Sequence, residues 1–239
     1  MTNISGFIIA KNEATRIDKA INSLKNVASE IIVVDSGSTD GTIEIARQLG
    51  AKTIFNEWHG YVKQKSFGEK LCQNNWILNI DADEELSPLL QQEIKNLLES
   101  GNMDDFIAYS INTVIMHRND KKLKPFAPSN RVIRLYNRNF CNFSNNTSNT
   151  TNDSVLFNPE IDKSTKLSNQ LKGPAYHRSF TSIEQLVNKA NFYSGEQAKD
   201  LIDKGRIPSK LRTSTEIITS FLKAYFLRRY FVFGFDGFV

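Results

Sequence analysis

Apolar and polar positions follow two different periods along the first hundred residues. Residues 14–27 and 42–49 carry apolar side chains at the spacing of an amphipathic helix, and Gly50 is a natural helix stop. Asp40 or Thr39 would cap the second of these helices. Around them lie short unbroken apolar runs, which are typical of buried strands. We expect strands at residues 4–10, 30–35, 51–55 and 76–80. Strands that alternate with helices predict an α/β fold with a parallel sheet and right-handed crossovers.

The pattern changes in the second half of the chain. Residues 106–115 and 131–136 alternate between apolar and polar side chains, which predicts two further strands. From Ser182 onward the spacing becomes helical, with Thr181 or Ser182 as the cap. The C-terminal part should therefore be helical.

The strand expected at residues 76–80 ends abruptly in acidic residues, Asp81-Ala82-Asp83-Glu84-Glu85. Open α/β sheets bind ligands at the carboxyl ends of their strands. Alternate residues of a strand point the same way, so we expect Asp81 and Asp83 to project together. Two adjacent carboxylates are a common way to hold Mg²⁺ or Mn²⁺ together with substrate phosphates. An isolated Asp-x-Asp is nevertheless weak, because acidic strand-to-loop junctions are common.

Composition sets wide limits. A chain of 239 residues with 40% hydrophobic residues can form one large α/β domain with a well-buried core. Cys72 and Cys141 have neither metal-ligand nor disulfide spacing. We expect no signal peptide and no spanning helix, hence a cytoplasmic protein, soluble or peripheral at the inner face of the membrane. The net charge of +4 suits anionic substrates or membranes and is too weak to indicate nucleic acid.

Three segments, residues 10–13 (Ala-Lys-Asn-Glu), 33–42 and 76–84, together resemble the nucleotide-sugar half of family 2 glycosyltransferases with the GT-A fold. Within that family the chain is similar to lipopolysaccharide-core β-1,4-glucosyltransferases, and residues 131–136 and 173–177 extend the resemblance. It implies a Rossmann-like mixed sheet flanked by helices, with a C-terminal, partly amphipathic helical extension. The implied domains are residues 1–180, divided into a nucleotide-sugar half (1–100) and an acceptor half (101–180), and an extension at 181–239.

The resemblance also implies residue roles. Asp83 would be the direct ligand of Mg²⁺ or Mn²⁺, Asp81 would contact ribose or a metal-bound water, and Asp35 would accept a hydrogen bond from the base. The implied nucleotide-sugar pocket consists of Ala10, Asn12, Glu13, Asp35, Ser36, Lys65, Asp81 and Ala82.

Ordinary structural roles remain open for several of these residues. Asp35 could be a turn or cap residue after a strand, and Glu13 a first-turn acid that faces a helix dipole. Lys65 could offset phosphate charge or be a solvated lysine on a helix; for Lys63 we favour the second interpretation. The chain contains neither the phosphate-loop nor the Gly-x-Gly-x-x-Gly pattern, which argues against mononucleotide kinases and dehydrogenases.

The acceptor half should supply a general base. Relatives carry an acid in a Val-His-Glu/Asp-like string after the Arg-rich strand, and Asp153 is our candidate, although Asn152 stands where His is expected. Asp153 could instead be one more polar residue of an Asn-rich loop. The resemblance also implies that His177 completes the metal site, whereas an isolated His is more often structural.

Residues 217–235 are apolar and aromatic, and Lys223, Arg228 and Arg229 interrupt them. This pattern is typical of a basic helix lying in a lipid interface, with packing against a core or a dimer partner as the alternative. We expect an inverting hexosyltransferase of cell-envelope biosynthesis. Its donor would be a nucleoside diphosphate sugar, with UDP-glucose as the first choice, and its acceptor a lipid-linked saccharide such as the lipopolysaccharide core. The alternatives are a sugar nucleotidyltransferase and a non-catalytic membrane-associated scaffold.

Overall fold

The computed structural model describes residues 2–117, 120, 122–143, 154–162, 165–178, 183–203, 205 and 209–237. The chain divides into two compact units, which are described separately. The first comprises Met1–Thr113 and Arg131–His177, and the second comprises Val114–Asn130 and Arg178–Val239.

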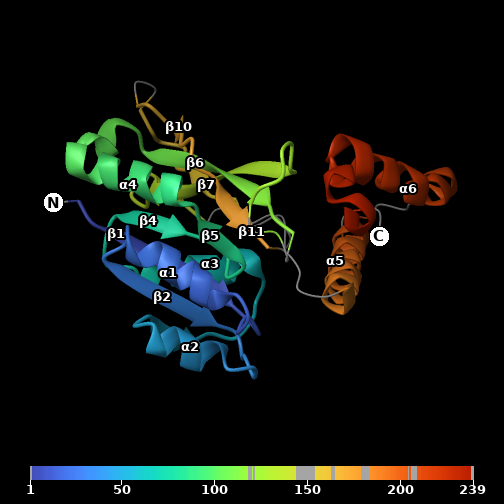
Figure 1. Ribbon diagram of the computed structural model, residues 1–239, viewed down its shortest axis with the longest axis horizontal. Coiled ribbons are helices and arrows are strands. Elements are labelled where there is room, and N and C mark those ends of the chain that lie inside the picture. The colour runs from blue at the N-terminus through green and yellow to red at the C-terminus, as the bar shows by residue number, and fades with distance from the viewer. Residues whose placement is uncertain are drawn as a thin grey trace. The chain divides into compact units, whose positions relative to one another are not determined.

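The first unit is built on a mixed sheet (Figure 1). Its parallel part has the order β3-β2-β1-β4, with β1 at Ile4–Ala10, β2 at Glu30–Asp35, β3 at Lys52–Phe55 and β4 at Trp76–Asn79. The sheet continues through β7 (Ser129–Asn137), which is antiparallel to β4, then β6 (Ala108–Ile115), β11 (Ala175–His177) and β5 (Glu84–Leu86). β10 (Asn169–Gln170) pairs with β6, while β8 (Cys141–Asn142) and β9 (Leu156–Phe157) form a separate pair.

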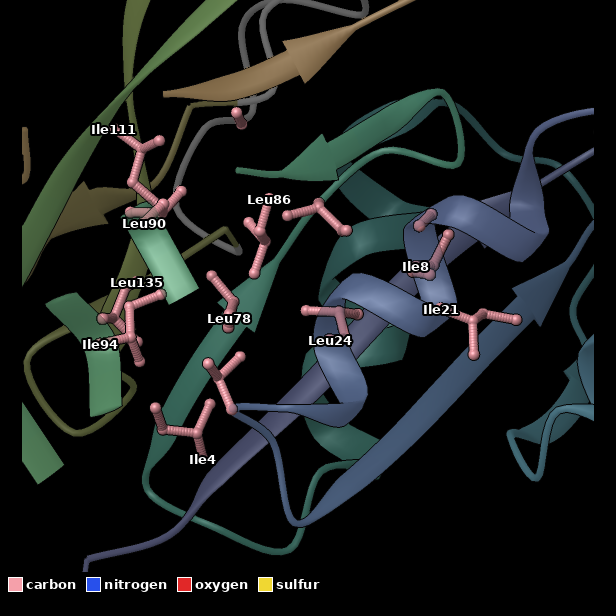
Figure 2. Packing of buried hydrophobic residues seen from close by; sticks show 14 of the residues in the cluster. Ile4, Ile8, Ile21, Leu24, Leu78, Leu86, Leu90, Ile94, Ile111 and Leu135 are labelled. Atoms are coloured by element: carbon pink, nitrogen blue, oxygen red, sulfur yellow. The ribbon is translucent and has the colours of Figure 1, made fainter. Parts of the chain in front are cut away.

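Helices cover both faces of the parallel part, because its strands are apolar on both sides. Helices α1 (Ile17–Lys25), α2 (Thr42–Gln48) and α4 (Pro88–Ser100) contribute to one buried cluster, part of which Figure 2 shows, with Ile21 and Leu24 of α1 turned toward the sheet. Helix α3 (Tyr61–Leu71) packs against the second cluster, on the opposite face. The strands between these layers are thereby held rigidly, with their carboxyl ends free for a site.

Local chemistry explains where the helices begin and end. Ser87 caps α4 by accepting a hydrogen bond from the Leu90 amide (3.2 Å), and Gly101 ends that helix in the left-handed conformation. For α2 we expected Asp40 or Thr39 as the cap, but Gly41 holds that position at φ +90°. Asp40 lies one residue before this cap and accepts a hydrogen bond from the Thr42 amide at 3.1 Å, so it still binds the first turn.

The α/β mixed sheet with flanking helices is confirmed, and the expected elements of the first half are all present with slightly different bounds. β5, β8, β9, β10 and β11 were not expected. Each has only two or three residues, which is too short for a period-two pattern to emerge from the sequence. Two of these short strands, β5 and β11, turn out to carry site residues.

The second unit contains α5 (Ile183–Asp203), α6 (Lys210–Leu222), a π-helical turn η2 (Lys223–Leu227) and a 3₁₀ segment η3 (Tyr230–Gly237). The ring of Phe233 lies 6.4 Å from the ring of His117 and 5.5 Å from Lys124 Nζ. Arg178 donates to the His117 and Asp120 carbonyls at 3.2 and 3.1 Å. These contacts join the segment between β6 and β7 to the C-terminal helices. None of the helices described is long and apolar enough to cross a membrane.

Candidate active site

The loops that follow β1 and β2 are braced against each other. Ala10 and Asp35 are register partners at the carboxyl ends of these strands, and the Ser36 amide donates to the Ala10 carbonyl at 3.1 Å. Asn12, at φ +56°, donates its amide to Ser38 Oγ (2.9 Å) and accepts the Thr39 amide on Oδ1 (2.8 Å). Two loops that would otherwise move independently therefore form one preorganised surface.

Asp35 is buried and organises its own turn. Its carboxylate accepts the Gly37 amide at 2.8 Å and the Ser38 amide at 3.0 Å, and the Ser38 hydroxyl donates to Oδ1 at 2.5 Å. Asp35 therefore does stabilise the turn after β2, as one of its two interpretations predicted. A carboxylate has about four lone-pair sites, so these bonds leave room for a further donor.

The acidic segment after β4 is a closed turn rather than a continuation of the strand. β4 ends at Asn79, the Glu84 amide donates to the Asp81 carbonyl at 2.9 Å, and Glu84 Oε2 accepts the Asp81 amide at 3.0 Å. The strand alternation that we used to predict a common direction for Asp81 and Asp83 thus stops before it reaches them, and the two carboxylates have different partners.

Asp81 is neutralised from within the protein. Lys65 Nζ, fully buried on α3, lies 2.9 Å from Oδ1, and Arg134 Nη2, on β7, lies 2.7 Å from Oδ2. Partial burial would raise the pKa of Asp81, but the positive charges of Arg134 and Lys65 outweigh it and hold that pKa well below its ordinary value. Lys65 is therefore not a solvated lysine, whereas Lys63 is exposed.

Glu84 shares the same guanidinium group. Arg134 Nη2 lies 2.5 Å from Glu84 Oε1, and both side chains are almost completely buried. Burial raises the pKa of Glu84, the Arg134 charge opposes that effect, and the nearby Asp81 charge reinforces it, so the pKa stays above its ordinary value. Lys65, Asp81, Arg134 and Glu84 thus form one buried charged network.

Asp83 faces a different group. His177 Nε2, on β11, lies 3.3 Å from Asp83 Oδ2, and Arg16 Nη1 lies 3.7 Å from the same oxygen. Arg16 is itself held by Glu13, which accepts from its Nε at 2.7 Å. Burial alone would lower the pKa of His177, but the hydrogen bond and charge of Asp83, with Glu84 and Asp81 beyond it, raise it. The 3.3 Å contact is therefore an ion pair whenever the imidazole is protonated.

The same pair fits a divalent cation in part. Two ligands at right angles on an ion with bonds of about 2.1 Å lie about 3 Å apart, close to the separation of Asp83 Oδ2 and His177 Nε2. Among the described residues there is no group of three or more His, Cys, Asp or Glu that could hold a metal. The chain would thus supply two ligands, of which the carboxylate is the kind that Mg²⁺ and Mn²⁺ prefer, and phosphates and water would complete the shell.

The structure brings most of the proposed site residues to one edge of the sheet. The residues expected there and found on the loops, strand ends and helix α3 just described are Ala10, Asn12, Glu13, Asp35, Ser36, Lys65, Asp81, Ala82, Asp83 and His177. Asp153 lies outside the described residues.

Three charged residues of the site were missed: Arg16, Glu84 and Arg134. Arg134 had a detectable signal, because it occupies a core-facing position in an alternating strand. Arg16 and Glu84 look like ordinary charged residues near a helix start and a turn.

The chain has relatives among glycosyltransferases. A family model for glycosyl transferase family 2 matches residues 5–162. An uncharacterised glycosyltransferase of Rickettsia bellii is 60% identical over 99% of this chain and 80% of its own length. The lipopolysaccharide core biosynthesis glycosyltransferase LpsC of Rhizobium meliloti is 28% identical over 99% of this chain and 85% of its own.

Solved structures match a smaller part of this chain than these sequence relatives do. Glucosyl-3-phosphoglycerate synthase from Mycobacterium tuberculosis, in complex with Mn²⁺ and UDP-glucose, has a TM-score of 0.39 at 22% identity, over 50% of this chain and 45% of that one. The family match and the 60% identical relative favour glycosyl transfer over nucleotidyl transfer and over a non-catalytic scaffold. The chain belongs to glycosyl transferase family 2 and is a glycosyltransferase that uses a sugar-nucleotide donor.

Proposed function

We propose that this protein is an inverting, metal-dependent hexosyltransferase that moves glucose from UDP-glucose to a lipopolysaccharide-core or related cell-surface saccharide. The observation that carries the proposal is the Asp83–His177 pair, 3.3 Å apart at the carboxyl edge of the sheet. It lies beside Asp81 and Glu84, whose carboxylates are held by the buried cations Lys65 and Arg134.

The nucleotide lies along the braced loops after β1 and β2. Ala10, Asn12 and Glu13 form one wall of the pocket, and Asp35 and Ser36 form the other. Asp35 uses a remaining lone pair to accept a hydrogen bond from the base. The bracing of these loops supports this assignment, because a preorganised pocket loses less conformational entropy on binding.

Asp83 and His177 would hold the cation, Mg²⁺ or Mn²⁺. When bound, the cation supplies Lewis-acid stabilisation of the departing nucleoside diphosphate. Asp81, fixed by Lys65 and Arg134, contacts ribose or a water of the cation, and Ala82 lines the pocket between the two acids.

Asp153 is the proposed general base. The acceptor hydroxyl oxygen forms a bond to the anomeric carbon from the face opposite the diphosphate, the bond from that carbon to the diphosphate breaks, and the hydroxyl proton passes to the Asp153 carboxylate. The configuration at the anomeric carbon inverts. One flank of the segment that contains Asp153 lies near the charged network, which is consistent with this role. β8 and β9 pair there, and the ring of Phe143 lies 5.7 Å from Lys65 Nζ, the cation on Asp81.

The acceptor assignment rests on LpsC, which is named as a lipopolysaccharide core biosynthesis enzyme and matches 99% of this chain. An acceptor on lipid is consistent with the second unit. Of the sixteen large apolar side chains that are exposed in the described part of the chain, twelve belong to that unit. Lys223, Arg228 and Arg229 lie among them, a combination suited to the surface of an anionic membrane.

Calorimetric titration of UDP, UDP-glucose, GDP-mannose and ADP-heptose, each with Mn²⁺ or with EDTA, tests the proposal. We expect UDP-glucose to bind tightly only with Mn²⁺, and the Asp83→Asn variant to lose the metal-dependent part. Turnover with an acceptor should release UDP and no pyrophosphate. Binding that is equally tight in EDTA would refute the metal dependence, and a preference for another donor would refute the choice of UDP-glucose.

A further inference from the structure

A single guanidinium group holds both carboxylates that flank Asp83. Arg134 Nη2 lies 2.7 Å from Asp81 Oδ2 and 2.5 Å from Glu84 Oε1. Asp81 and Glu84 are the first and last residues of the turn, and Asp83 lies between them. The position of Asp83 is therefore determined at both ends by one side chain from a different strand.

Arg134 reaches the turn because of the sheet order. β7 runs antiparallel to β4 with Leu135 opposite Leu78, which places Arg134 next to the end of β4. There its Nη1 also approaches Asn79 Oδ1 at 3.4 Å. The planar fork of arginine presents several donors in a fixed geometry, so it can hold two carboxylates and an amide at once. A lysine at this position would supply the charge without the fixed geometry.

The turn is also connected to His177. In the antiparallel pair of β5 and β11, the register partner of His177 is Glu84. Glu84 is thus both the residue that Arg134 holds and the backbone neighbour of the imidazole that faces Asp83. The backbone of Glu84 is thus bound both to the turn that contains Asp83 and to the strand that carries His177.

We infer that Arg134 is a positioning residue: by holding Asp81 and Glu84 together, it fixes the separation of Asp83 and His177 and so prepares them to share one cation. The inference rests on the proposed metal-dependent function of this pair. Partners of this kind, one step removed from the ligands, commonly change metal affinity by roughly 10–100-fold.

The first test needs no metal. The chain has three histidines, His59, His117 and His177, so the carbon–proton correlation spectrum of the full chain contains three imidazole Cε1–Hε1 resonances, one for each histidine. We expect Arg134→Lys to shift the His177 resonance while those of His59 and His117 stay in place. Arg131→Gln, at an exposed position of the same strand, should shift none of the three. An unchanged His177 resonance in Arg134→Lys would overturn the inference.

The second test separates positioning from stability. Arg134→Met leaves buried carboxylates without their cation and is expected to lower Tm strongly. The double variant Arg134→Met/Glu84→Gln removes one of those charges and should recover most of the Tm. The gain in UDP affinity that Mn²⁺ provides is measured as the Kd in EDTA divided by the Kd in Mn²⁺. We expect this gain to fall by roughly 10-fold or more in the double variant and by less in Arg134→Lys.

The outcomes distinguish this inference from the proposed function. If wild-type protein shows no metal-dependent gain in UDP affinity, the proposed function fails, and the histidine spectrum still decides whether Arg134 controls the position of His177. If the double variant recovers both Tm and metal-dependent affinity, the role of Arg134 is only structural and the inference is wrong.

Discussion

Asp81 and Asp83 are separated by one residue, yet their carboxylates have different surroundings. Asp81 binds Lys65 and Arg134, both buried, while Asp83 faces His177 and Arg16. A carboxylate that is already neutralised by two cations gains little from binding a metal, whereas one beside an imidazole can exchange a proton for a cation. We therefore expect substitutions of Asp81 and of Asp83 to have different effects on metal binding.

Asp83→Asn tests the metal-binding role at the residue scale. We expect kcat to fall by roughly 10²–10³-fold, the usual scale for lost electrostatic stabilisation at a reacting centre. The far-ultraviolet circular dichroism and Tm should stay close to wild type. Glu85→Gln, which changes the neighbouring acid outside the charged network, is the control and should leave kcat within twofold. Near-normal turnover of Asp83→Asn would refute the assignment.

Glu69 gives the chain a predictable pH dependence of stability. Burial raises its pKa, although contacts with Tyr136 and the positive charge of Arg138 oppose the shift. The folded state therefore holds the proton more tightly than the unfolded chain. The contribution of this group to the free energy of unfolding is fully present below its pKa in the unfolded chain, about 4.3. It is lost as the pH rises through its pKa in the folded protein.

Glu69→Gln should remove that dependence. The Tm of the variant and of wild type is measured by thermal unfolding at pH 5 and at pH 8. The difference, variant minus wild type, should be larger at pH 8. A Tm difference that is the same at both pH values would contradict the raised pKa.

At the scale of elements, α3 illustrates how packing outweighs helix propensity. It carries Lys65 and Glu69 on a face that lies against the sheet, with Gly68 between them. A Cβ at Gly68 would come within 2.7 Å of the ring of Phe7 and 3.2 Å of Val34. Glycine is therefore needed for the close approach of α3 to β1 that brings Lys65 to Asp81.

Gly68→Ala should destabilise the protein although alanine is the better helix former. Propensity favours alanine by about 1 kcal/mol, whereas overpacking a core costs roughly 1–3 kcal/mol. In α5, a Cβ at Gly195 would meet nothing within 4 Å, so Gly195→Ala should have the opposite sign. Chemical denaturation of both variants measures the difference. A stabilising Gly68→Ala would mean that α3 can shift away from the sheet without cost.

At the scale of the whole molecule, exposed apolar side chains are unevenly distributed. Phe226 and Leu227, directly before Arg228 and Arg229 in the sequence, are 57% and 77% exposed, and Phe235 is 78% exposed. The net charge of +4 has the same sign as this segment. Apolar contact and charge should therefore act together at an anionic lipid surface.

Sedimentation with vesicles that contain phosphatidylglycerol tests this expectation. Phe226→Ser/Leu227→Ser should reduce binding at all salt concentrations. Arg228→Gln/Arg229→Gln should reduce it mainly at low salt, since each cation near such a surface contributes about 1 kcal/mol. Phe55→Ser, which removes an equally exposed ring from the first unit, is the control. Wild-type protein that stays in the supernatant would exclude the lipid partner and favour packing against a protein.

The sequence by itself determined the alternation of strands and helices in the first half, the position of the acidic turn and the loops after β1 and β2. These features depend on local periodicity and on Gly, Ser and Asp in turns, which act over a few residues. The sequence also identified Asp83, His177 and Lys65 as candidates, through motifs that occur in a fixed order along the chain.

Only the tertiary structure decided which charges meet. Arg134 reaches Asp81 across 53 positions because β7 pairs with β4, and His177 reaches Asp83 because the three-residue strands β5 and β11 pair. Such pairings depend on sheet order, and strands this short carry no period of their own. Neighbouring residues in the sequence indicate local structure, whereas the partner of a buried charge is set by long-range packing, so Asp81 was found from its motif and its counterions only from the fold.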